Sequence, residues 1–381
     1  MNIRKMLFVV SAYPKGVDSN WAFIQPVVHE IAKLGIECYV FAPQSLTRIV
    51  AKKAKKRPDY WEDTNENGNV IHIYQPKIIT FSNLFPKLNT FIAYKAIKRI
   101  IKRKKLTADV VYSHFWENAV IASKILVEKP HFVATGEDKI WVYNTCSRKK
   151  IEYTVNNIKG IISVSSKNLK ESNDLRLINK NVRTIVLPNG VNSNIFYHIP
   201  KNIARKELGY EQDYKIGIFV GQFNERKGIN RVVEAAKKIP TLKLIFIGKG
   251  PIQINKNAQI LYIGQVKHED VVKYLCASDF FILPTLAEGC CNAIVEALAC
   301  GLPVISSDMD FNDDILSNEY SIKIDPLNIN QIYEAMLKLL DDNKLYEMSN
   351  NAYNYGKQLS IEKRVYSIMK FIKETGEHND L

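Results

Sequence analysis

Two carboxylates and the helix start between them are the residues of this chain best suited to chemistry. Glu288 and Glu296 stand eight positions apart, between a short apolar run closed by Pro284 and a helical run expected from about Asn292 to Cys300. The first backbone N–H groups of a helix have no partner within the helix, and the helix dipole adds partial positive charge there. Such an end suits an anion such as a diphosphate. One turn further in, a carboxylate can accept hydrogen bonds from a ribose diol.

The flanking sequence decides between two interpretations of this spacing. Taken alone, Glu in an early helical turn is common because it complements the dipole. From Leu283 to Asp308, however, the chain resembles the signature of retaining family 4 glycosyltransferases: a strand ending in Pro, then Glu-Gly, seven residues from Glu to Glu, and Ala-Leu-Ala-x-Gly-x-Pro-Val. The resemblance implies an α/β protein of the GT-B fold, with two doubly wound Rossmann-like domains facing across a cleft.

The same resemblance implies a role for each polar group of this stretch. Glu288 is expected to contact the donor sugar as a catalytic residue, and Glu296 to hold the ribose of a nucleotide sugar. In retaining enzymes of this fold the departing phosphate is thought to assist attack on the same face, so no protein nucleophile is required. The amides expected at the diphosphate belong to Gly289, Cys290, Cys291 and Asn292.

A second loop supplies cations. It opens with Gly221 after an apolar run, and a glycine there lets the backbone approach a ligand closely. Arg226 and Lys227 can neutralise a diphosphate leaving group, although cations in loops are most often simply solvated. The family usually carries an Arg after the first glycine and a Lys before the last. Lys227 matches, but Gln222 takes the place of the Arg, and we hypothesise that Arg226 substitutes for it.

Further positions follow from the resemblance. Val266 lies in a segment similar to the one whose backbone meets the base, and completes the expected donor set. In the acceptor half, His114 follows a strand-like run and is expected near the sugar as a second catalytic residue; a purely structural role is equally open. Three further acceptor-side candidates are Asp18, Asn20 and Asp138. The last belongs to a pattern in which Thr135 replaces the family His, so the role of that His does not carry over.

Strand-like and helical patterns alternate almost throughout, which implies parallel, doubly wound sheets. A turn-forming run at 187–192 marks the passage from one half to the other. We expect an acceptor-binding domain over residues 1–190, with the C-terminal helix in 360–381 packing back on it. The nucleotide-sugar domain is expected over 191–359.

Composition excludes several classes of protein. No apolar run approaches the roughly 20 residues of a membrane-spanning helix. Six cysteines show neither metal nor disulfide spacing and are interpreted as packing residues in a reducing cytoplasm. The Asp-x-Asp at Asp308 and Asp310 is expected to be a turn and helix cap, so we expect no metal. No cofactor is expected beyond the nucleotide-sugar substrate.

The net positive charge of the chain comes entirely from the first half. Residues 1–190 hold 31 Lys or Arg and 15 Asp or Glu, a formal +16, whereas residues 191–381 hold 22 and 24, a formal −2. The run Lys95–Lys105 places Ile97, Ile100 and Ile101 on one helical face below a basic collar. That face can meet anionic lipid or belong to the core. Nucleic acid is not expected as a partner, because no recognised binding module accompanies the charge.

These expectations converge on a metal-independent, retaining hexosyl- or N-acetylhexosaminyltransferase. Its acceptor would be a glycan or a polyprenyl-diphosphate-linked sugar in capsule, O-antigen or exopolysaccharide synthesis. The basic half predicts a peripheral location on the anionic cytoplasmic face of the membrane. Two alternatives remain open: a nucleotide-sugar epimerase-like enzyme of the same fold, and a degenerate, non-catalytic nucleotide-sugar binding protein.

Overall fold

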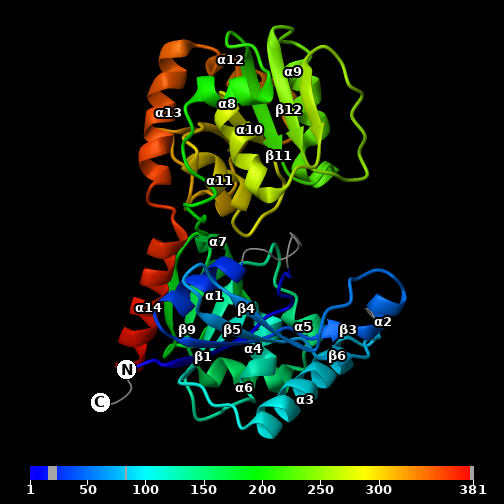
Figure 1. Cartoon of the computed structure of the whole chain (residues 1–381), viewed down its shortest axis with the longest axis vertical. Coiled ribbons are helices and arrows are strands. Elements are labelled where there is room, and N and C mark those ends of the chain that lie inside the picture. The colour runs from blue at the N-terminus through cyan, green and yellow to red at the C-terminus, as the bar shows by residue number, and fades with distance from the viewer. Residues whose placement is uncertain (16–23, 82–83, 378–381) are drawn as a thin grey trace. The chain divides into compact units, whose positions relative to one another are not determined.

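The computed structural model describes residues 1–15, 24–81 and 84–377, which form two compact units (Figure 1). The first unit comprises Met1–Leu187 and Val365–Leu381, and the second comprises Pro188–Arg364. Among the described residues, no helix is both long enough and apolar enough to cross a membrane.

In the described part of the first unit, eight strands form one sheet in the order β10-β9-β8-β7-β1-β2-β5-β4. All neighbours are parallel except β4 and β5. The strands are β1 (Lys5–Val9), β2 (Glu37–Phe41), β4 (Tyr60–Thr64), β5 (Val70–Tyr74), β7 (Val110–His114), β8 (His131–Thr135), β9 (Ile158–Ser163) and β10 (Arg183–Val186). The short strands β3 (Gln44–Ser45) and β6 (Lys77–Ile78) pair separately.

Helices cover this sheet and close the first core. They are α1 (Ile24–Lys33), α2 (Leu46–Val50), α3 (Pro86–Lys104), α4 (Trp116–Ala122), α5 (Val142–Thr145), α6 (Arg148–Asn157) and α7 (Ser166–Asp174), with α14 (Ile361–Glu377) joining from Val365 onward. In the central strand β1, Met6, Leu7, Phe8 and Val9 are all fully buried. An unbroken run of hydrophobic residues is typical of a parallel strand, because helices cover both faces of the sheet.

The basic run at Lys95–Lys105 forms the C-terminal half of α3, whose isoleucines face the core. Ile97 is 0% and Ile101 7% exposed, and both belong to the hydrophobic cluster of the first unit, with Ile100 packed at its margin. The alternative in which this isoleucine face meets lipid is therefore wrong. α3 packs on α4 and α5, so the first unit itself covers these isoleucines.

The second unit holds, in its described residues, a fully parallel six-stranded sheet in the order β13-β12-β11-β14-β15-β16. The strands are β11 (Lys215–Val220), β12 (Leu242–Ile247), β13 (Ile260–Gly264), β14 (Phe280–Leu283), β15 (Val304–Ser307) and β16 (Ser321–Ile324). The helices are α8 (Lys201–Leu208), α9 (Ile229–Ala236), α10 (Val271–Ala277), α11 (Asn292–Ala299), α12 (Ile329–Lys338) and α13 (Asp342–Gly356), with short 3₁₀ turns η1 (Glu225–Lys227), η2 (His268–Asp270) and η3 (Asp310–Asn312).

The strand order of this sheet reverses between β11 and β14. From β11 the chain builds outward through β12 and β13, and from β14 it builds the other way through β15 and β16. In open parallel sheets, ligands bind outside the carboxyl ends of the strands at such a switch point. The loop from β11 to α9 and the loop from β14 to α11 are the two connections that leave this point. Both carry residues that the sequence marks for chemistry.

Candidate functional site

The two loops at the switch point bring Lys227 and Glu288 together. The ammonium Nζ of Lys227 contacts Oε1 of Glu288, and the two side chains are only 11% and 9% exposed. The hydroxyl of Thr285, fully buried, donates to the same oxygen over 2.8 Å. Burial disfavours the charged form of Lys227, but attraction by the Cys291 thiolate, which exists only at high pH, and by Glu288 outweighs burial and raises the pKa of Lys227. The site therefore holds a buried cation and a carboxylate fixed by two donors.

Backbone and arginine hydrogen bonds join the two loops. The N–H of Leu286 donates to the carbonyl oxygen of Arg226 over 2.8 Å. In return, Nη1 of Arg226 donates to the carbonyl oxygen of Ala287 over 2.7 Å, and Nη2 of Arg231 donates to that of Pro284 over 2.9 Å. The guanidinium of Arg226 thus holds the segment that leads into Glu288.

Gly228 allows the two loops to come this close. Its φ of +79° is in the left-handed region, and a Cβ there would lie 2.5 Å from the carbonyl oxygen of Pro284. Just before it, the side chain of Asn224 caps η1 by accepting from the N–H of Lys227 over 3.0 Å. A side chain at position 228 would therefore push the Lys227 loop away from the Glu288 loop.

The remaining predicted residues of this loop lie nearer to solvent. A Cβ on Gly221 would meet nothing closer than 3.7 Å, so packing within the protein does not require glycine there. Gln222 is exposed and accepts a hydrogen bond from Nδ2 of Asn224 over 3.1 Å. A Cβ at position 221 would make only ordinary van der Waals contact with Phe219 and Leu283.

Asn189 shapes the start of α11. Its Nδ2 donates to the carbonyl oxygen of Cys290 over 3.3 Å and to Oδ1 of Asn292 over 2.8 Å, and its backbone N–H lies 3.4 Å from Sγ of Cys290. Burial raises the pKa of Cys290 to about 11 and that of Cys291 to about 12. Both thiols are therefore neutral near pH 7 and place no negative charge against an anion at this helix start. Gly289 is buried beside them.

Glu296 forms an ion pair that the sequence did not reveal. Its Oε1 lies 3.0 Å from Nε2 of His268, the first residue of η2; the glutamate side chain is 11% exposed and the histidine 48%. The hydrogen bond to Glu296 outweighs burial and raises the pKa of His268. The ring of His268 packs edge-on against Phe196 at 5.0 Å between centroids. Val266, two residues earlier, lies partly buried against the core of the second unit.

In the first unit, the structure places His114 at the carboxyl end of β7, half-buried. It is followed by Phe115, a non-glycine residue with φ of +78° and ψ of 151°, a backbone conformation that costs on the order of 1–3 kcal/mol and often marks functional positions. The rings of the two residues pack edge-on at 4.3 Å.

A carboxylate that was not among the predicted site residues, Glu137, contacts the residue that follows Phe115. Glu137 accepts the N–H of Trp116 through Oε1 over 2.9 Å and the hydroxyl of Thr135 through Oε2 over 2.6 Å. Burial raises the pKa of Glu137. Asp138, the predicted acid, is exposed. The other two acceptor-side candidates, Asp18 and Asn20, lie outside the described residues.

The Asp-x-Asp segment faces a lysine. Nζ of Lys323 lies 2.6 Å from Oδ1 of Asp313 and 3.9 Å from Oδ1 of Asp308. In the part of the chain that the structure describes, no three His, Cys, Asp or Glu side chains are grouped as metal ligands.

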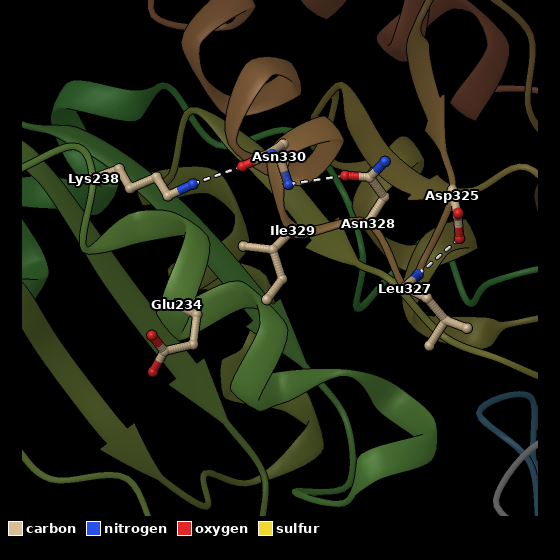
Figure 2. A pocket seen from close by; sticks show the side chains of 7 residues that line it. All are labelled: Glu234, Lys238, Asp325, Leu327, Asn328, Ile329 and Asn330. Atoms are coloured by element: carbon tan, nitrogen blue, oxygen red, sulfur yellow. Dashed lines mark hydrogen bonds between the residues drawn. The ribbon is translucent and has the colours of Figure 1, made fainter.

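A hollow of about 620 Å³ at another place in the second unit takes no part in this site. Figure 2 shows hydrogen bonds among residues that line this hollow: Nζ of Lys238 donates to Oδ1 of Asn330 over 2.7 Å, and the backbone N–H of Asn330 donates to Oδ1 of Asn328 over 3.1 Å. None of the predicted site residues lines it. The lining residues are Glu234, Lys238, Asp325, Leu327, Asn328, Ile329 and Asn330.

Known proteins share this architecture. The structure superimposes on that of sucrose-phosphate synthase from Thermosynechococcus elongatus with a TM-score of 0.77, at 19% identity, covering 98% of this chain and 100% of that chain. In sequence, the chain is 26% identical over 355 residues to the putative teichuronic acid biosynthesis glycosyltransferase TuaC of Bacillus subtilis (strain 168), with 88% of each chain covered. Over 361 residues it is 24% identical to the UDP-Gal:alpha-D-GlcNAc-diphosphoundecaprenol alpha-1,3-galactosyltransferase of Escherichia coli, with 87% and 90% covered.

The fold is therefore GT-B, and the predicted α/β class is confirmed. Residues 200–359, which lie within the second unit and include both switch-point loops, match the model of the family described as Glycosyl transferases group 1. The resemblance to glycosyltransferases that the sequence predicted is confirmed: the group 1 model matches residues 200–359, and the relatives that cover most of the chain are named as glycosyltransferases.

Proposed function

We propose that this protein is a retaining glycosyltransferase that moves a sugar from a nucleoside-diphosphate sugar to a lipid-linked or polysaccharide acceptor in surface-glycan biosynthesis. The observation that carries the proposal is the contact of Lys227 with Glu288 at the switch point, beside the start of α11. The relative from B. subtilis is named for teichuronic acid biosynthesis and that from E. coli for a diphosphoundecaprenol-linked acceptor, which supports the choice of acceptor class.

Each group has a role in the proposed reaction. Lys227 and the first N–H groups of α11 bind the diphosphate and stabilise the charge that develops on it as the glycosidic bond breaks. In the described residues, the side-chain hydrogen bonds of Glu288 all fall on Oε1, which leaves Oε2 for the donor sugar. Glu296, oriented by His268, accepts from the ribose. The departing phosphate assists attack on the same face, so the proposal includes no protein nucleophile.

No metal and no cofactor enter this proposal, and the transferred group is a hexose or N-acetylhexosamine. Charge neutralisation at the leaving group is assigned to Lys227 and to the α11 start instead of to a divalent ion. We place the enzyme on the cytoplasmic face of the membrane, where the basic first half, at a formal +16, meets anionic lipid.

A ligand panel followed by a product assay tests the function. A ligand that binds the native state raises its melting temperature, so UDP-, GDP- and ADP-sugars are compared by thermal shift. The stabilising donor is then incubated with and without a polyprenyl-diphosphate-linked sugar. We expect transfer only with the acceptor, and a product anomer that matches the donor by NMR.

Other outcomes identify the alternatives. Isomerisation of the donor without any acceptor would establish the epimerase-like enzyme. Binding without turnover, unaffected by Glu288→Ala, would establish a non-catalytic binding protein. An inverted product anomer would keep the transferase but reject retention.

A further inference from the structure

One exposed face of α3 changes from apolar to basic along the helix. Leu88 and Phe91 are each 41% exposed, and Lys95, Lys98 and Lys102 follow them, all exposed. These positions recur at steps of three and four residues, so they share one side of the helix. The opposite side is the one buried in the core of the first unit, through Thr90, Ala93, Ile97 and Ile101.

Neighbouring residues widen the apolar end of this face. Leu84 is 80% and Phe85 57% exposed, and the ring of Phe85 packs edge-on with that of Phe81 at 6.0 Å. Trp141, 56% exposed, is the N-cap residue of α5. A hydrogen bond from Oγ1 of Thr90 to the carbonyl oxygen of Thr145 over 3.0 Å joins α3 to α5. The exposed apolar residues Phe81, Leu84, Phe85, Leu88, Phe91 and Trp141 are called the α3–α5 patch below.

Cations border the α3–α5 patch on several sides. The ammonium groups of Lys95 and Lys150 both lie 5.3 Å from the ring centre of Phe91, and that of Lys139 lies 4.6 Å from the ring centre of Trp141. Residues 84–105 contain eight Lys or Arg and no Asp or Glu. Exposed apolar residues in such numbers, with lysine side chains packed against their rings, mark an interaction surface.

We propose that the α3–α5 patch and the lysines of α3 dock the first unit on an anionic lipid bilayer. Helices that bind in a bilayer interface combine an apolar face, which enters the acyl boundary, with Lys or Arg that meet lipid phosphates. Trp is enriched at headgroup depth, which suits Trp141. The side chains that enter the boundary are Leu84, Phe85, Leu88 and Phe91, and those at the phosphates are Lys95, Lys98 and Lys102.

This assignment rests on the proposed function only in its choice of partner, since a polyprenyl-linked acceptor lies in such a bilayer. It differs from attraction by net charge alone, because insertion of apolar side chains predicts binding that survives moderate salt. In this proposal the side of α3 that faces lipid carries Leu88 and Phe91, and not the isoleucines considered from the sequence, which are buried.

Vesicle flotation tests the docking. The probes are vesicles of phosphatidylcholine alone and of phosphatidylcholine with an equal part of phosphatidylglycerol. We expect the full chain to float with the anionic vesicles, and the double variant Leu88→Glu/Phe91→Glu to bind them at least about tenfold more weakly, because it loses apolar transfer energy and adds like charge. The triple variant Lys95→Glu/Lys98→Glu/Lys102→Glu is expected to lose the preference for anionic lipid.

A matched control comes from the second unit. Leu327 and Tyr346 are 65% and 72% exposed, so Leu327→Glu/Tyr346→Glu makes the same kind of change outside the patch and is expected to float like the wild type. Trp141 gives an independent signal: vesicles should shift its fluorescence to the blue, and Trp141→Phe should abolish that shift. Melting curves of all variants verify that they fold.

Three results would overturn the docking: equal flotation of the patch variant and the wild type, no binding of the wild type to anionic vesicles, or a wild-type dimer that Leu88→Glu/Phe91→Glu converts to a monomer. The last would make the patch an interface between copies. Thermal shift by the nucleotide sugar is expected to be the same in the patch variant. A normal shift without vesicle binding therefore rejects the docking alone, whereas a missing shift in the wild type rejects the donor site.

Discussion

Nε2 of His268 lies 3.0 Å from Oε1 of Glu296, and this pair connects η2, which follows β13, with the second turn of α11. The His268 side chain is half exposed and that of Glu296 is almost buried. The histidine therefore contacts the carboxylate from the solvent side and fixes its orientation. In the proposed function Glu296 accepts from the ribose, and His268 is its positioning residue.

The first prediction concerns the titration of His268. Because its pKa is raised, the pair stabilises the folded protein fully below the unfolded-state pKa of about 6.5, and this stabilisation is lost as the pH rises through the folded-state pKa. Its size is under about 1 kcal/mol, since His268 is well solvated. NMR titration is expected to show a lower pKa for His268 in Glu296→Gln than in the wild type. His198, whose ring contacts the carbonyl oxygen of Cys300, is the internal control, and an unmoved His268 would contradict the pair.

The second prediction separates Lys227 from Glu288. Glu288→Gln keeps the volume and a partner for Thr285 but removes the charge, so kcat should fall about 100-fold or more. The nucleoside diphosphate of the donor that the thermal-shift panel selects, written below as UDP, should bind as tightly as before or tighter. Lys227→Gln should weaken UDP about tenfold or more, because the diphosphate loses its cation. Calorimetric titration with UDP and initial rates measure the two effects. Equal weakening of UDP by both substitutions would refute the division of roles.

Gly228 gives a prediction about stability. Gly228→Ala adds strain at positive φ and a clash with the carbonyl oxygen of Pro284, and is expected to cost about 3 kcal/mol or more. Gly209→Ala is the matched control, because φ is +70° there and a Cβ would meet no atom within 4 Å; it should cost only about 1 kcal/mol. Denaturant unfolding of both variants measures the difference, and equal costs would show that the loops separate freely.

Arg226 and Gln222 can be tested together. If Arg226 acts on the donor, through the diphosphate or through the loop that it holds by Ala287, then Arg226→Ala should weaken UDP by about tenfold. Adding Gln222→Arg, which restores the usual family residue, should recover affinity if the missing charge is the cause. Recovery would assign Arg226 to the diphosphate, and no recovery would assign it to the loop. Unchanged affinity in Arg226→Ala would remove the hypothesis.

Metal removal is the fifth prediction. Lys323 already supplies positive charge to Asp308 and Asp313, so we expect EDTA to leave activity unchanged and Asp308→Asn to change it by less than about twofold. Initial rates after chelation, with and without added Mn²⁺, measure this. A strict requirement for Mn²⁺ would overturn the metal-independent mechanism.

Much of the candidate site in the second unit was predictable because its signals are local. A glycine after an apolar run, a basic pair and two spaced glutamates are all visible within short stretches around Gly221 and Glu288. Their contacts were not predictable, since the hydrogen bonds between Arg226 and the Leu286–Ala287 backbone join positions 60 residues apart. His268 was missed for a related reason: a single histidine has no pattern until tertiary structure supplies Glu296.

The first unit was less predictable. β4, Tyr60–Thr64, alternates exposed and half-buried residues at the antiparallel edge of the sheet, so it lacks the apolar run that marked the buried strands. The charge of α3 was evident from the sequence, but not which side of the helix faces the core. Both sides carry apolar residues: Ile97 and Ile101 lie on the buried side, and Leu88 and Phe91 lie on the exposed side. Glu137 became visible only through its bonds to Trp116 and Thr135.

Glu288 forms an ion pair with Lys227, so the ammonium group of the proposed donor site already has a counter-charge. An incoming anion gains only the difference between its own attraction for the ammonium group and that of the carboxylate it displaces. A small anion without an O–H or N–H group, such as chloride, offers Glu288 no hydrogen bond in exchange, whereas a diphosphate with a sugar attached brings hydroxyl groups that can donate to it. In the proposed function, the ion pair therefore favours a ligand that carries both an anionic group for Lys227 and a hydroxyl donor for Glu288.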